Sequence, residues 1–291
     1  MSLYAFVGAL ETGLVFALVA LGAYVTFRVL DFPDLTVEGS FPFGAAVAAS
    51  FMAIGVNPWI ATLLAMIAGA ITGLVTGLLN IQFRILNILA GILTAIALYS
   101  VNLRVMGRPN IGLIGVDTVY STIEHLGFPS FYVPVILLTA VVVVCKLFLD
   151  LFLSTGYGLA MRAAGANPRM ARANGINVDR MVYLGLAIAN ALTALSGALF
   201  AQMLGAADVS MGIGVIVIAL AAVIGGTALL PSRVVALATL ACVLGSIFYR
   251  IVIGLALSSN AIGFTASDVN LVTAILVAVA LYLPGCKSKH S

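Results

Sequence analysis

Charged side chains are scarce in this sequence. Lys and Arg number 13, Asp and Glu number 10, and together they make up 8% of the 291 residues, against about a quarter in ordinary soluble domains. This scarcity excludes a conventional soluble domain, whose surface carries many charges. The formal net charge of +3 is spread along the chain rather than gathered into a basic stripe, so no nucleic-acid partner is expected.

Cysteine and histidine are rarer still. Cys145, Cys242 and Cys286 lie far apart in or beside apolar stretches, without the paired spacing of a metal site, and we interpret them as packing residues. His125 and His290 are isolated, with no nucleophile or ligand set near them in the sequence. The sequence therefore predicts no metal, no cofactor and no acid–base chemistry in this chain.

Long apolar runs make up most of the sequence. Apolar residues make up 63% of the chain, the mean hydropathy is +1.22, and about 20 such residues in a helix cross the ~30 Å core of a bilayer. No stretch shows the alternating polarity of a membrane β-barrel. We predict an all-α, polytopic membrane protein, surrounded by lipid, with about eight to ten transmembrane segments. The nine candidate segments are 3–29, 42–56, 58–80, 88–102, 132–153, 181–204, 213–230, 233–257 and 269–283.

Two of these segments, 42–56 and 88–102, are short for a full span. Short or broken helices are tolerated at membrane depth only where protein or a water-filled cavity covers their ends. The first segment lacks a basic leader and contains Glu11, so we expect it to stay in the mature protein. Gly69, Gly73 and Gly77 recur every four residues and predict a helix-packing seam.

The distribution of Lys and Arg predicts the orientation, because basic residues in short loops mark the cytoplasmic side. We expect the stretch 154–180 and the C-terminus to be cytoplasmic, the N-terminus to be outside, and 103–131 to be an external loop with a short surface helix. Arg250 should then reach the external headgroups. The protein would lie in a bacterial or archaeal cell membrane, the inner one where there are two. The basic residues that support this are Arg162, Arg169, Arg172, Arg180, Lys287 and Lys289.

An internal repeat divides the chain. The stretch 87–99 aligns without gaps on 270–282, Asp34 to Thr36 parallels Asp208 to Ser210, and Glu11 parallels Asn190. Since the two copies start on opposite sides, they would be inverted repeats, which in transporters place the substrate path between the halves. Within a single transmembrane domain, 1–291, we expect a first half 1–105, a linking loop and helix 106–153, a cytoplasmic loop 154–180 and a second half 181–284.

The loop 154–180 holds a short helix with both ends marked. Asn167 can cap free backbone N–H groups, Pro168 suits the first helical position, and Gly175 suits the left-handed residue after the last turn. Such a helix is too short to be stable alone. One side of it is rich in Ala and contains Met161 and Met170. We predict that this side docks in a groove of a partner protein. A simple positive-inside anchor would explain the arginines but not the capped helix.

These residues also carry a family resemblance. Gly158, Ala160, Met161, Arg162 and Ala163 are followed by Met170, Ala171 and the run Gly175 to Arg180, and Ala222 to Gly226 follows further on. The pattern closely resembles the coupling loop and Gly-Gly signature of the branched-chain amino acid and sugar class of ABC importer permeases. The stretch 34–40 resembles a subgroup linked to aromatic amino acid or uncharacterised uptake systems. One departure is 227–231, where those permeases usually have a turn such as Ile-Gly-Ser.

The resemblance implies a mechanism and partners. A cytoplasmic ATPase dimer, which binds the ATP and Mg, would grip the loop, with a second permease copy and an extracytoplasmic binding protein completing the importer. This chain is not expected to be an enzyme, because it has no Gly-x-x-x-x-Gly-Lys-Ser/Thr cradle. The implied coupling residues are Gly158, Met161, Arg162, Ala163, Asn167, Pro168, Arg169, Met170, Arg172 and Gly175.

Polar groups inside a bilayer are costly, so each is a candidate for the translocation path or its gate. Glu11 either lines the path or extends to the outer interface. The residues near 34–40 and 208–210 either cap short helices or flank a cavity, and the paired asparagines either join helices or touch the solute. The candidates are Glu11, Asp34, Thr36, Glu38, Ser40, Asn87, Asp208, Ser210 and Asn270.

The alternative function is a secondary transporter driven by an ion gradient. Inverted repeats and broken helices suit both kinds of protein, but an ion-coupled carrier usually needs a carboxylate pair in mid-membrane, and only Glu11 is arguably placed there. The permease subunit of an importer is therefore the favoured prediction. Its expected substrate is a small solute, with an amino acid favoured by the resemblance and a sugar or nucleoside left open.

Overall fold

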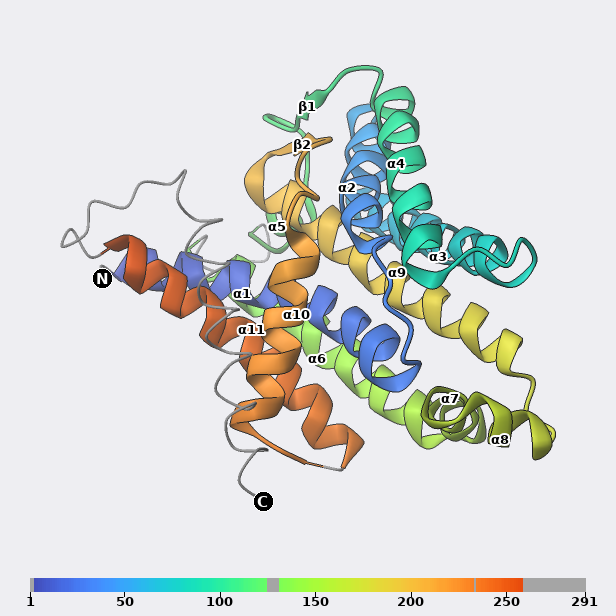
Figure 1. The fold of residues 1–291 in the computed structure, drawn as a ribbon. Coiled ribbons are helices and arrows are strands. Elements are labelled where there is room, and N and C mark those ends of the chain that lie inside the picture. The colour runs from blue at the N-terminus through green and yellow to red at the C-terminus, as the bar shows by residue number, and fades with distance from the viewer. Residues whose placement is uncertain (1–2, 125–130, 233, 259–291) are drawn as a thin grey trace.

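The computed structural model describes residues 3–124, 131–232 and 234–258, which form helices and one short pair of strands (Figure 1). A π-helical stretch, η1, continues the first helix. The elements are α1 (Leu3–Ala23), η1 (Tyr24–Val29), α2 (Val37–Ala53), α3 (Pro58–Ile81), α4 (Asn87–Met106), β1 (Asn110–Gly112), α5 (Val119–Glu124), α6 (Val133–Ser154), α7 (Gly156–Ala166), α8 (Pro168–Ala173), α9 (Val178–Leu204), β2 (Ala206–Asp208), α10 (Val215–Leu229) and α11 (Val235–Ser258).

Six helices among the described residues are long and apolar enough to cross a bilayer. They are α1 with η1, α3, α4, α6, α9 and α11, while α2 and α10 are apolar but have only 17 and 15 residues. The prediction of an all-α, polytopic protein is confirmed. Eight of the nine predicted segments coincide with these helices, and the ninth, 269–283, lies outside the described residues together with Asn270.

Helix α9, the first helix of the second half, packs against three helices of the first half, α1, α2 and α3. It packs along α2 and α3, which are the second and third helices of the first half. In the same way α1, the first helix of the first half, packs along α10 and α11, the second and third helices of the second half. The predicted glycine seam lies at the α3–α9 contact. A Cβ on Gly69 would lie 2.3 Å from the Cβ of Ala194, and one on Gly73 would lie 2.1 Å from the carbonyl oxygen of Leu186. The small residues let the two helix backbones approach closely.

The molecule has two distinct ends (Figure 1). One, which we call the coupling end, gathers the segment after η1, the α3–α4 connection, α7, α8 and the start of α9. At the other, the strand end, β1 pairs antiparallel with β2, and the ends of α2 and α4 meet. The pairing β1–β2 joins the linking region to the second half of the chain. The short helix predicted within 103–131 is present as α5.

Helix α2 begins earlier than predicted. It starts at Val37 rather than at residue 42, and it contains Pro42. Proline lacks the N–H that would bond the carbonyl four residues before it, so the carbonyl of Glu38 loses its helical partner. That carbonyl instead faces Gly212, where a Cβ would lie 1.9 Å from its oxygen. Helix α4, with 20 residues, also exceeds its predicted bounds and reaches a full span.

Candidate functional site

The loop 154–180 contains two helices rather than the single one predicted. Its second helix, α8, has the predicted ends: Asn167 Oδ1 accepts a hydrogen bond from the N–H of Met170 at 3.0 Å, Pro168 is the first helical residue, and Gly175 has φ +81°. The first, α7, begins after Thr155, whose hydroxyl accepts from the N–H of Gly158 at 3.4 Å. The pair forms a capped helical hairpin at the coupling end.

One side of α7 is packed into this chain. Met161 is fully buried, and a Cβ on Gly185 of α9 would lie 3.4 Å from its sulfur. A Cβ on Gly165 would lie only 2.0 Å from the carbonyl oxygen of Val29, the last residue of η1. The prediction that Met161 shares a partner-facing side with Met170 is therefore wrong. Because Met161 points into the core, it fixes α7 to the membrane helices.

The other side of the hairpin is open. Met170 is 63% exposed, and the arginines of the loop are exposed around it, while Ala163 is half-buried and Gly158 is buried where α7 meets the end of α6. Arg172 Nη2 lies 3.1 Å from Asp179 Oδ1, an exposed ion pair worth little to stability. The exposed arginines are Arg162, Arg169, Arg172 and Arg180.

Just beyond η1, the chain turns inward at Asp34. This carboxylate is fully buried, and it accepts hydrogen bonds from the N–H of Thr36 at 2.9 Å and from the Asn190 amide of α9 at 2.8 Å. Ser40 donates to the oxygen of the same amide at 2.6 Å. The three segments 34–36, α2 and α9 are thus joined through one asparagine side chain.

Threonines extend this cluster to α3 and α4. The Ser40 hydroxyl lies 2.8 Å from that of Thr72, the Thr36 hydroxyl lies 2.7 Å from that of Thr76, and Thr76 donates to Thr94 at 3.0 Å. All of these side chains are buried. We call Asp34, Thr36, Ser40, Thr72, Thr76, Thr94 and Asn190 the buried polar network. Bonds in such surroundings are strong, and their loss leaves groups unsatisfied.

The network corrects one interpretation and adds residues that the sequence did not indicate. Thr36 precedes α2 but its side chain makes no capping hydrogen bond, and Ser40 lies inside the helix, so neither is a cap. Asn190 was predicted only as the repeat counterpart of Glu11. Glu11 itself is half-buried, about two turns into α1. A small polar side chain in an apolar helix was the only available signal for the threonines.

The counterpart of Asp34 in the second half lies at the strand end. Asp208 Oδ1 accepts from the N–H and the hydroxyl of Ser210, and its Oδ2 accepts from the Asn110 amide at 3.2 Å. The hydrogen bonds from Ser210 hold the pKa of Asp208 below its usual value. The structure therefore does not bring Asp208 or Ser210 to the buried polar network.

Two further polar residues have defined contacts. Asn87 Oδ1 accepts from the Asn80 amide at 2.7 Å, which joins the start of α4 to α3, one of the two roles considered for it. The prediction that Arg250 extends to the external headgroups is wrong. Its guanidinium carbon lies 4.1 Å from the ring centre of Phe16 on α1, and the attraction between the cation and the ring turns this side chain inward.

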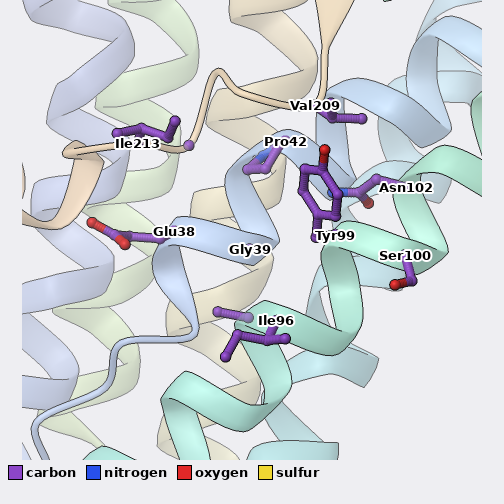
Figure 2. Close-up of a pocket in the computed structure, with 11 residues that line it drawn as sticks. Glu38, Gly39, Pro42, Ile96, Tyr99, Ser100, Asn102, Val209 and Ile213 are labelled. Carbon is purple, nitrogen blue, oxygen red and sulfur yellow. The ribbon is translucent and has the colours of Figure 1, made fainter. Parts of the chain in front are cut away.

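A pocket of about 370 Å³ lies between α2, α4 and the loop after β2, and thus between the two halves of the chain (Figure 2). Glu38, in the first turn of α2, supplies the acidic side chain of this pocket. Figure 2 shows Glu38 on one side of the pocket and Asn102, beside Tyr99, on the other. Such a volume is in the range of small-molecule sites. Of the candidates from the sequence, Glu38 lies in this pocket.

Comparison with known proteins places the chain in a family. The model of the branched-chain amino acid transport system permease component family matches residues 5–282. The chain is 41% identical to a tyrosine transport system permease protein of Clostridioides difficile (strain R20291), over 93% of this chain and 88% of the relative. It is 35% identical to an uncharacterised protein of Rickettsia prowazekii (strain Madrid E), over 94% and 95% of the two chains.

A solved structure shares the fold. It is described as a metal-chelate type ABC transporter in an inward-facing conformation, and the match has a TM-score of 0.51 with 16% identity, covering 99% of this chain and 87% of that one. At this identity the match shows the helix arrangement alone. Together with the family match, it agrees with the six apolar helices of a multi-pass membrane protein. The chain belongs to the permease component family of branched-chain amino acid transport systems.

Proposed function

We propose that this chain forms the translocation path of an ATP-driven importer for an amino acid, and that a separate ATPase drives it through α7 and α8. The observation that carries the proposal is the two-sided hairpin. Met161 and Gly165 fix its inner side to the membrane helices, while Met170 and the arginines are exposed on its outer side. A helix pair with that division can receive a force from outside the chain and pass it inward.

The contact with η1 gives the force a route. Because Gly165 leaves no room for even one extra carbon against Val29, movement of α7 moves the end of η1. The chain continues from there to Asp34, and the buried polar network connects this segment to α2, α3, α4 and α9. Packed elements shift between discrete arrangements rather than deforming smoothly. We infer that a displacement of the hairpin tilts these helices together.

The same proposal assigns orientation and partners. The coupling end faces the cytoplasm, so the N-terminus lies outside, and the two halves are inverted repeats with the path between them. A second copy of this chain completes the membrane part, an extracytoplasmic binding protein delivers the solute, and the ATPase subunits hold ATP and Mg. The name of the Clostridioides relative supports an amino acid, and specifically an aromatic one, as the substrate.

The test is a charge placed on the outer side of the hairpin. We expect Met170→Asp to lower solute-stimulated ATPase activity of the reconstituted complex by at least about tenfold, because burying an unpaired carboxylate in an interface costs several kcal/mol. Phe83→Asp is the matched control, since Phe83 is 65% exposed in the α3–α4 connection at the same end. It should retain coupling and expression.

The result also separates the importer from the alternative. Uptake that survives removal of ATP and collapses when the ion gradient is dissipated would establish an ion-coupled carrier. Full ATPase stimulation in Met170→Asp, with normal assembly, would contradict docking on α8. An ATP-driven importer should lose uptake when ATP is removed, and its Met170→Asp variant should lose ATPase stimulation.

A further inference from the structure

One buried side chain in the pocket has unmet hydrogen-bonding capacity. Asn102 of α4 is only 1% exposed, and neither its amide nitrogen nor its oxygen has a hydrogen-bond partner among the described residues. It lines the pocket between α2, α4 and the loop 209–213. An unpaired buried amide destabilises a fold, and natural structures contain few of them. A ligand in the pocket would satisfy both atoms.

The other polar groups of the pocket define what could bind. Glu38 supplies a carboxylate at the opposite side from Asn102 (Figure 2). The Glu38 carbonyl is covered by Gly212, so the carboxylate is the acceptor that Glu38 offers at this side. A carboxylate suits an ammonium group. An amide with one donor and one acceptor group free suits a hydroxyl, which can both accept and donate.

Apolar surface separates these two polar positions. Tyr99, Ile96 and Ile213 line the pocket and are 52%, 65% and 74% exposed. An aromatic ring provides a large contact area with a preferred stacking geometry. The pocket therefore has an acidic side, an apolar middle and an amide side, and it matches an elongated solute with the complementary order of groups.

We propose that this pocket is a solute-binding site on the translocation path for a hydroxylated aromatic amine, with the amine at Glu38, the ring along Tyr99 and the hydroxyl at Asn102. The proposal rests on the importer function above and specifies where the solute is held. Its position between the first-half helices and a second-half loop is where relative movement of the halves would open or close it. Gly212 fixes the loop against α2, because a Cβ there would overlap the Glu38 carbonyl.

A labelling experiment on the full chain in lipid nanodiscs tests the site. Ser100→Cys places a thiol at the exposed lining of the pocket, and its maleimide reaction rate is measured against the unmodified protein as baseline. The probes are L-tyrosine, L-phenylalanine, which lacks the hydroxyl, and hydroxyphenylpropionate, which lacks the amine. We expect tyrosine to protect the thiol at concentrations about tenfold lower than either analogue, because a site built for a polar group rejects ligands that lack it.

Two variants in this background assign the groups. Asn102→Leu should remove the preference for tyrosine over phenylalanine and leave the Tm equal or higher, since an unpaired amide is replaced by an apolar group of similar shape. Glu38→Gln, which removes the charge with almost no change in size, should remove the preference for the amine. Glu124→Gln removes the same charge from α5, outside the pocket, and should change neither preference.

Three results of the labelling and Tm measurements by themselves would overturn the site. They are equal protection by all three probes, preferences that survive both variants, and a lower Tm in Asn102→Leu, which would reveal a structural role for the amide. Failure of the importer function gives a different pattern. In that case tyrosine still protects Ser100→Cys with the expected preferences, but uptake does not depend on ATP. ATP-dependent uptake without protection would reject the site and leave the importer function intact.

Discussion

Two short segments of this chain make the same turn in opposite surroundings. Asp34 accepts a hydrogen bond from the N–H of Thr36 at 2.9 Å, and Asp208 accepts one from the N–H of Ser210 at 2.8 Å. Asp34 is fully buried and bonds Asn190, whereas Asp208 is partly exposed and bonds Asn110. The local sequence specifies the turn in both places. What surrounds each turn decides whether its loss affects the membrane helices or only a surface loop.

The largest expected effect follows from removing the buried carboxylate. Asp34→Ala leaves the Thr36 N–H without its acceptor and takes one bond from the Asn190 amide. We expect a loss of about 2–4 kcal/mol in the free energy of unfolding, because each buried group left unsatisfied costs about 1–3 kcal/mol. The measurement is the Tm of the purified protein in one detergent. Asp208→Ala, prepared in parallel, should lower the Tm far less, and equal losses would remove the distinction between the two turns.

A smaller effect concerns acid sensitivity at the exposed turn. Hydrogen bonds from Ser210 lower the pKa of Asp208 in the folded protein. The stabilisation by this carboxylate is therefore complete above its unfolded pKa of about 3.9 and is lost as the pH falls through the lower folded value. Because the group is exposed, the contribution stays below about 1 kcal/mol. Asp208→Asn should flatten this part of the Tm profile between neutral pH and pH ~3.

That profile has a clear contrary outcome. If wild type and Asp208→Asn lose Tm in parallel down to the lowest pH, the carboxylate does not contribute as the hydrogen bonds indicate. Both proteins should be measured at constant ionic strength, because salt screens exposed charges. Retention of a small difference at neutral pH alone would indicate a change in the loop rather than titration.

Local rules predicted the ends of α8 well. Asn167, Pro168 and Gly175 each act within a few residues of their own position, and the structure has the cap, the first turn and the positive φ that they specify. Local rules failed at α2, where Pro42 and the polar residues before it suggested an irregular stretch. Packing against Gly212 and α4 supports a helical start at Val37 instead.

The long-range contacts could not be predicted in the same way. Thr72, Thr76 and Thr94 have the composition of residues that bond their own helix, and only the packing of α2, α3 and α4 shows that their hydroxyls also meet other side chains. Asn102 lies at the end of an apolar run and gave no signal. Met161 was predicted to contact a partner protein, but it is buried within this chain. The sequence of a helix does not show which of its sides packs against the rest of the same chain.

The proposed transmission of force from α7 to η1 depends on a contact without spare room. Gly165→Ala places a methyl group against the carbonyl of Val29, whereas Gly156→Ala, in the same helix, meets nothing within 4 Å. The most direct measurement is the ratio of solute uptake to ATP hydrolysis in the reconstituted complex for these two variants. We predict that Gly165→Ala lowers this ratio by at least about fivefold, since overlap with the backbone forces a shift, while Gly156→Ala leaves it unchanged. Equal ratios in both variants and wild type would contradict the transmission of force through this contact.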